Sequence, residues 1–234
     1  MTSSSVNISR WARAIWRHPS ALLLTVQMIS VLVYPFMEHR ALGRAVFETL
    51  AILVLALVMR SITWRPVYIW GAAVVAISAG ALSIIDAVEP SSHLVVAGGL
   101  LHAGLYFVAG GSLLRYMFSD QRVTLDELFA VGATFTVLAW AFAYTFVVVQ
   151  ALQPTAFAGA GPAPRTWFEL LFLSVTTLTS TGLSDIVPVT AHARSFVMIE
   201  QIAGLGYVAL VVSSIVGMTL RRGRGTAGAD SDDQ

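Results

Sequence analysis

Six apolar stretches, each of spanning length, alternate with short polar segments along this chain. A hydrocarbon core of about 30 Å needs roughly 20 apolar residues in a helix. The stretches cover residues 20–37, 45–62, 66–85, 94–114, 128–152 and 195–220. A seventh apolar segment, residues 167–173, is too short to cross. The pattern predicts an all-α membrane protein with six transmembrane helices, and a re-entrant helix and loop between helices five and six.

The composition agrees with this class. Hydrophobic residues make up 56% and charged residues 12% of the 234 residues, whereas soluble proteins average about 25% charged. There are no cysteines, which excludes disulfides and thiolate metal sites. The fourth stretch is rich in Gly and Ala, which favours close helix packing.

A polar linker at residues 119–127 suggests a domain boundary. Thr124 with Glu127 three residues later fits a capping box at the start of the fifth helix. We predict a four-helix membrane domain at residues 1–120, a helix, loop and helix domain at 121–222, and a short flexible cytoplasmic tail at 223–234.

Arginine positions predict the orientation. With both termini inside, ten arginines lie on the inner side and four on the outer side, as the positive-inside rule requires. The inner ones are Arg10, Arg13, Arg17, Arg60, Arg65, Arg115, Arg122, Arg221, Arg222 and Arg224, and the outer ones are Arg40, Arg44, Arg165 and Arg194. We therefore expect a multi-pass protein of the cell membrane with cytoplasmic termini, whose re-entrant segment enters from outside.

The re-entrant segment is unusually polar. Six of the eight residues from 174 to 181 carry a hydroxyl, and Gly182, Asp185 and Pro188 follow. Hydroxyls that bond to their own helix backbone are the simplest explanation of such a run. Irregular backbone at membrane depth, however, is tolerated only where protein buries it or water lines it. The trailing Gly, Asp and Pro, with spanning helices on both sides, favour a pore loop.

The letters of this loop resemble those of a known family. Residues 177–185 read T-L-T-S-T-G-L-S-D, with Pro188 three positions on. They resemble the pore module of tetrameric potassium channels, whose loop typically reads T-L-T-T-x-G-Y-G-D. The resemblance covers about residues 123–220. It implies a passive channel, assembled as a homotetramer, in which carbonyl and hydroxyl oxygens replace the water shell of K⁺.

The resemblance also assigns roles to residues of the loop and its surroundings. The ion-conducting filter would consist of Thr179, Ser180, Thr181, Gly182, Leu183, Ser184 and Asp185, with K⁺ or Na⁺ held at Ser180, Thr181 and Gly182. Filter support would come from Thr176, Thr177 and Glu200, with Glu200 bonded to hydroxyls such as those of Thr176 or Thr177. Gly204 and Gly206 would form a gating hinge, or would permit close packing. Asp185 would attract cations as part of a ring of carboxylates, or would be an ordinary turn residue.

Leu183 and Ser184 stand where the family has Tyr and its second Gly. We therefore predict a degenerate filter, preserved from Ser180 to Gly182 and wider beyond, with reduced selectivity for K⁺ over Na⁺. The string Ser-Thr-Gly-Leu-Ser also resembles the single-glycine filters of the Trk and Ktr potassium transporters, which keeps K⁺ the leading ion. The fourth helix offers only His102 and Arg115 as basic residues, so we predict no Arg-rich voltage sensor.

Other functions stay open at this point. A Na⁺-permeable, non-selective or non-conducting pore-loop relative is the main alternative. A secondary transporter usually shows an internal repeat, and an intramembrane enzyme would need a motif such as G-x-S-x-G or H-E-x-x-H; the chain has neither motif and no convincing repeat. We expect no enzymatic activity, no cofactor besides the permeant cation and no nucleic-acid partner. Arg221, Arg222 and Arg224 would bind anionic lipid or anchor the last helix. Glu48 would pair with Arg44 or His102, or take part in transport.

Overall fold

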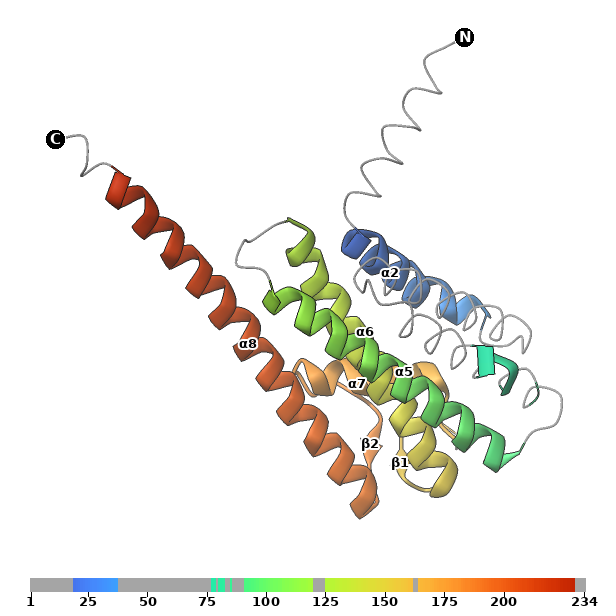
Figure 1. Ribbon diagram of the computed structural model, residues 1–234. Coiled ribbons are helices and arrows are strands. Elements are labelled where there is room, and N and C mark those ends of the chain that lie inside the picture. Colours follow the sequence, from blue (N-terminus) through green and yellow to red (C-terminus); the bar gives the residue numbers. More distant parts are fainter. Residues whose placement is uncertain are drawn as a thin grey trace, which may run out of the picture.

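The computed structural model describes residues 19–37, 77–78, 80–82, 85, 91–119, 125–161 and 164–229. Its helices are α2 (Pro19–Met37), α5 (Ser92–Ser119), α6 (Leu125–Leu152), α7 (Trp167–Leu178) and α8 (Ala191–Ala229). Two short strands, β1 (Phe157–Ala158) and β2 (Val187–Pro188), lie between α6 and α8 along the chain. Figure 1 shows these helices as a bundle from which the far end of α8 projects.

Four of the described helices are long and apolar enough to cross a membrane. Their candidate spans are Ser20–Met37, Ser92–Phe118, Asp126–Leu152 and Ala191–Ser214. They coincide with the first, fourth, fifth and sixth predicted stretches. The second predicted stretch lies outside the described residues, as do Glu48 and the Thr124 cap, and the third is described only at residues 77–78, 80–82 and 85. The helical, multi-span character predicted from hydropathy is confirmed for the described part.

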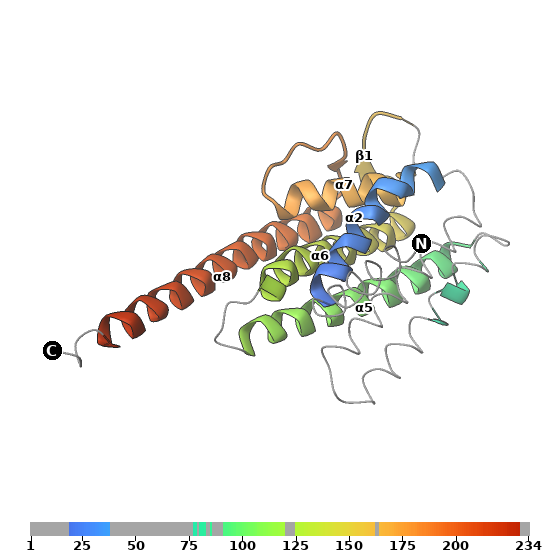
Figure 2. The same cartoon turned by 90° about the horizontal axis from the view of Figure 1, so that it is seen from above.

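Helix α6 is the central element of the described bundle. It packs against α2, α5, α7 and α8, and from above α7 and α5 lie on opposite sides of it (Figure 2). A helix that is apolar on all sides is suited to such a buried position. Ala139, Ala141 and Ala143 are fully buried, because small side chains let neighbouring helices approach closely.

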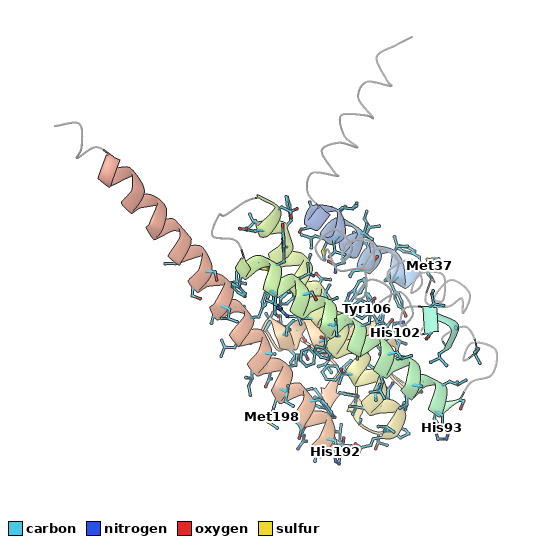
Figure 3. All side chains as sticks on the ribbon, viewed as in Figure 1. Met37, His93, His102, Tyr106, His192 and Met198 are labelled. Carbon is cyan, nitrogen blue, oxygen red and sulfur yellow. The ribbon has the colours of Figure 1, made fainter. Side chains whose placement is uncertain are left out.

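Helix α5 packs along α6 through its own glycines. A Cβ at Gly99 would lie 2.7 Å from a methyl of Val148, and a Cβ at Gly110 would lie 3.0 Å from a methyl of Leu138. Figure 3 shows His102 and Tyr106 on this helix, and both side chains are buried. The His102 ring stacks on Tyr144 of α6 with centroids 4.4 Å apart. Gly99 and Gly110 therefore permit the close packing of α5 against α6.

Helix α2 is attached to the beginning of α6. The Ser20 hydroxyl donates to Asp126 Oδ2 at 2.9 Å, and its backbone N–H donates to Oδ1 at 3.2 Å. Further along, the Gln27 amide donates to the Ala133 carbonyl at 3.4 Å. Helices α2 and α5 thus pack against α6 of their own chain.

The chain between α6 and α8 enters and leaves at one end of the bundle. Helix α6 ends and α8 begins at that end (Figure 1). There β1 and β2 pair antiparallel, with Phe157 opposite Pro188 and Ala158 opposite Val187. The 12-residue α7 is too short to span. It packs between α6 and α8, so the loop that follows it lies inside the length of the bundle.

Candidate functional site

Helix α7 begins at a well-formed cap beside the end of α6. The Thr166 hydroxyl accepts from the Glu169 N–H at 3.3 Å, and Glu169 Oε2 accepts from the Thr166 N–H at 2.6 Å. This reciprocal pair is a capping box. One residue earlier, the Gln150 side chain of α6 bonds both the N–H and the C=O of Arg165, at 2.8 and 2.9 Å. The start of α7 is therefore fixed to α6.

An aromatic cluster holds the same end of α7 from the side. The Trp167 ring lies 4.8 Å from Tyr34 of α2, and 5.6 Å and 6.1 Å from Tyr144 and Trp140 of α6, centroid to centroid. Phe168 stacks on Tyr34 at 5.5 Å. Aromatic pairs in this range add about 0.5 to 1.5 kcal/mol each beyond burial. Helices α2 and α6 thereby set the tilt of α7.

A buried polar junction holds the middle of α7. Ser174, Glu200 of α8 and Ala139 of α6 are all fully buried. The Ser174 hydroxyl lies 2.8 Å from the Ala139 carbonyl oxygen and makes a still shorter hydrogen bond with Glu200 Oε1. Glu200 was expected to bond to the hydroxyls of the loop. Its partner is Ser174, the first hydroxyl of the run, and not Thr176 or Thr177, the two that were given as examples.

The end of α7 rests directly on the backbone of α8. A Cβ built on Gly204 would lie 2.1 Å from the Leu178 carbonyl oxygen and 2.8 Å from its carbon. No side chain fits at that distance, so only glycine permits this contact. A Cβ on Gly206 would meet nothing within 4 Å. Of the two alternatives predicted for Gly204, close packing is therefore present in the structure.

The loop after α7 folds back onto the last turn of the helix. The Ser180 N–H donates to the Thr177 carbonyl at 2.9 Å. The next two N–H groups, those of Thr181 and Gly182, both donate to the Thr176 carbonyl, at 3.0 and 3.1 Å. The hydroxyls of Thr181 and Thr179 also lie 3.2 and 3.3 Å from that oxygen. The beginning of the loop is thus held by the Thr177 and Thr176 carbonyls, and the Thr176 carbonyl accepts most of these bonds.

The backbone angles explain why two consecutive N–H groups reach one acceptor. Ser180 has φ of +59° and Gly182 has φ of +67°, and Thr181 between them lies outside the left-handed region. Positive and negative φ therefore alternate over Ser180, Thr181 and Gly182, and such alternation turns successive N–H groups to one side of the chain. In a trans peptide the C=O points opposite to the following N–H. The carbonyls of Ser180 and Thr181 therefore face the same way, away from α7.

The alternation stops after Gly182. Among the residues that the structure describes, Ser180 is the only non-glycine residue with a positive φ, so Ser184 does not adopt the left-handed angle. The Ser184 hydroxyl instead accepts from the Ile186 N–H at 3.1 Å. Leu183 is 78% exposed in the isolated chain. The inner and outer halves of the loop therefore have different backbone geometry.

The outer end of the loop is tied to the segment after α6. Ile186 is buried against Gly159, where a Cβ would lie 2.3 Å from its Cδ1. The Val189 N–H donates to the Ala156 carbonyl at 2.8 Å. Gln153 Oε1 accepts a hydrogen bond from the Thr190 hydroxyl at 2.8 Å, and Gln153 Nε2 lies 3.0 Å from Nδ1 of His192. Figure 3 shows His192 at the start of α8. Together with the bonds to Thr176, these contacts hold the loop at both ends.

The predicted site residues are thus brought together on one loop. Most of the side chains of residues 179–185 are exposed, whereas Thr176 and Thr177 beneath them are buried. The carboxylate of Asp185 makes no hydrogen bond or ion pair with another described residue. The side chains of Arg221, Arg222 and Arg224 lie outside the described part.

Several residues that position the loop were not predicted. They are Gln150, Gln153, Arg165, Thr166 and Ser174. Two of them left a readable signal. Thr166 and Glu169 have the spacing of a capping box, and Ser174 shares a helical face with Leu170 and Leu178, four residues away on each side. No sequence signal marks Gln150, Gln153 and Arg165, because their roles depend on contacts with residues distant in the sequence.

Comparison with known proteins bears on the same segment. Residues 131–221, which run from α6 through the loop into α8, match a family model described as "Ion channel". No curated protein and no solved structure gives a significant match. Residues 131–221 are therefore similar to an ion channel domain, and the match supports a membrane-embedded ion channel of the pore-loop type and not an enzyme.

Proposed function

We propose that the protein is a passive cation channel, in which four identical chains each contribute residues 179–185 to one central pore. K⁺ is the favoured ion, and its selectivity over Na⁺ is reduced. The observation that carries the proposal is the parallel orientation of the Ser180 and Thr181 carbonyls, which follows from the paired N–H bonds to Thr176. Consecutive oxygens on one side of a chain are what a dehydrated cation requires.

An oligomer is required by the number of oxygens that one chain can supply, and the number four is what the resemblance to potassium channels implies. One chain would supply the carbonyls of Ser180, Thr181 and Gly182 and the Ser180 hydroxyl, and these cannot surround an ion from one side. Four copies around an axis complete rings of oxygens. The match to the ion channel family supports such an oligomeric assembly in lipid. The match also supports a membrane protein with several spans. A cell-membrane location, six transmembrane helices and cytoplasmic termini remain part of our proposal.

The outer half of the loop accounts for the reduced selectivity. Ser184 lacks the left-handed angle, so the alternation that aligns the Ser180 and Thr181 carbonyls does not extend to position 184. Fewer stacked oxygen rings remove less of the hydration shell, so the pore distinguishes two monovalent cations less well. The exposed Asp185 carboxylates at the outer mouth raise the local cation concentration. A Na⁺-permeable pore is the second candidate, and Leu183 and Ser184 are the residues that favour it.

The helices around the pore support a channel without an Arg-rich voltage sensor. In α5, His102 is buried, stacks on Tyr144 and bonds the Gly98 carbonyl at 2.8 Å. His102 thus packs against α6, and Arg115 is the one Arg in α5. Arg221, Arg222 and Arg224 lie in the chain at the cytoplasmic end of α8, where anionic lipid would contribute about 1 kcal/mol per Arg.

Reconstitution of the full-length protein in liposomes tests the proposal. Purified protein of tetrameric mass, placed in a K⁺ gradient, is expected to pass cation current without an added cofactor. Bi-ionic K⁺/Na⁺ reversal potentials then decide between the two candidates: a clear shift toward the K⁺ equilibrium potential supports a K⁺ pore, and a value near zero supports a non-selective one. Absence of any cation current from pure tetramer, or a stable folded monomer in membranes, would overturn the proposal.

A further inference from the structure

In the junction of Ser174, Glu200 and Ala139, the Ser174 hydroxyl contacts two oxygens but has only one hydrogen to donate. The Ser174 hydroxyl lies within hydrogen-bond distance of the Ala139 carbonyl and of Glu200 Oε1. A serine hydroxyl carries one hydrogen, and a peptide carbonyl carries none. With an ionised Glu200, one of the two oxygen pairs would face each other with no hydrogen between them.

A proton on Glu200 supplies the missing hydrogen. The carboxyl O–H then donates to the Ser174 hydroxyl, and Ser174 donates to the Ala139 carbonyl. Each contact has one donor and one acceptor, as the geometry requires.

The surroundings of Glu200 agree with a neutral group. The Glu200 side chain is 0% exposed to water. It forms no ion pair with a described basic residue, since the ion pair found among the described residues joins Arg165 to Glu169 at the far end of α7. Glu200 Oε2 has no hydrogen-bond partner among the described residues. An unpaired carboxylate in such a place is strongly unfavourable, whereas the carbonyl oxygen of a neutral acid is tolerated at much lower cost.

We propose that Glu200 is a neutral carboxylic acid in the folded protein, and that the hydrogen-bond chain from Glu200 through Ser174 to Ala139 fixes α7 between α6 and α8. Glu200 acts as a positioning residue: it does not touch the ion, but it holds the helix whose last turn carries residues 179–185. The positioning part rests on the proposed channel function, and the protonation part does not.

Infrared difference spectroscopy tests the proton directly. The spectrum of the wild-type protein minus that of Glu200→Gln is expected to contain the C=O band of a hydrogen-bonded carboxylic acid, and Ser174→Ala is expected to shift that band without removing it. The matched control Glu169→Gln, at the half-buried and ion-paired acid of α7, should leave the band in place. If the difference shows a carboxylate band instead, Glu200 is ionised and the proposal is wrong.

Cation flux tests the positioning role on the same variants. Gln keeps a donor to Ser174, so Glu200→Gln should retain flux within about twofold of wild type, whereas Glu200→Ala should lose about tenfold because Ser174 is left without its donor. Equal loss in both variants, or failure of Glu200→Gln to assemble, overturns the donor assignment. If the wild-type protein itself passes no current, the channel proposal fails, and the infrared result still decides the protonation.

Discussion

Gly204 of α8 lies against Leu178, the last residue of α7, so closely that a Cβ at position 204 would be 2.1 Å from the Leu178 carbonyl oxygen. This contact fixes the end of α7 from which residues 179–185 emerge. Together with the Thr166 cap and the Ser174 junction, it gives α7 three attachment points along its length. The position of the loop is therefore set by helices α6 and α8.

The Gly204→Ala variant should be destabilised and should conduct poorly. The new methyl has to displace backbone atoms of Leu178, and overpacking of this kind costs about 1 to 3 kcal/mol. Thermal unfolding in detergent and liposome flux measure the two effects. Gly206→Ala is the matched control on the same helix, because its Cβ meets open space and Ala is favoured over Gly in a helix by about 0.5 to 1 kcal/mol. If Gly204→Ala conducts normally while Gly206→Ala does not, the hinge interpretation of Gly206 is favoured over the packing role of Gly204.

Gly182→Ala should alter ion selectivity with little loss of stability. The site has room for a methyl, since nothing lies within 4 Å of the Cβ position, but φ is +67°. The left-handed angle costs an alanine about 1 to 2 kcal/mol, and relief of that strain would turn the carbonyls on either side out of line. Reversal potentials and thermal unfolding, compared with Gly111→Ala in α5, separate the loop effect from a general one. An unchanged reversal potential would contradict the role of this angle in the filter.

The Asp185→Asn variant should lower the conductance in a salt-dependent way. The exposed carboxylates attract cations over a Debye length of about 30 Å at 0.01 M salt but only about 3 Å at 1 M. Single-channel conductance is therefore expected to fall severalfold at low salt and to approach the wild-type value at high salt. A reduction that is the same at both salt concentrations would indicate a structural role in the turn instead.

The double variant Leu183→Tyr with Ser184→Gly should increase selectivity for K⁺ over Na⁺. It restores the letters of the potassium channel loop, and glycine at 184 admits the left-handed angle that Ser184 does not adopt. The alternation from Ser180 to Gly182 can then continue outward and align a further carbonyl. Bi-ionic reversal potentials measure the change. The control Ser184→Ala removes the bond to the Ile186 N–H without permitting that angle, and it should not raise selectivity.

Hydropathy predicted the helices well because a bilayer imposes a simple length requirement on apolar segments. The first predicted stretch, residues 20–37, agrees with α2, and residues 128–152 agree with α6 within three residues. Helix α8 extends beyond both predicted ends, from Ala191 to Ala229. Its first turn contains His192 and Arg194, which hydropathy does not count as membrane residues although they continue the same backbone hydrogen bonds.

The partner of Glu200 shows where local reasoning ended. Its place in the apolar sixth stretch marked it as a buried acid near the loop, since an intramembrane acid needs a reason to be there. Which hydroxyl it meets depends on the rotation of α7 against α8. That rotation is set by the Leu178 contact with Gly204 and by the aromatic cluster at Trp167. The sequence predicted that Glu200 lies near the loop hydroxyls, and helix packing determines that its partner is Ser174.

The sequence by itself determined that this is a helical membrane protein with a short polar loop between two long apolar helices, because spanning length and hydroxyl content are local properties. The tertiary structure decided how that loop is held. It turned two consecutive N–H groups onto the Thr176 carbonyl, placed a left-handed serine at 180 and ended the alternation at Gly182. These features arise from contacts between segments far apart in the chain and from backbone angles, and residue type alone fixes neither.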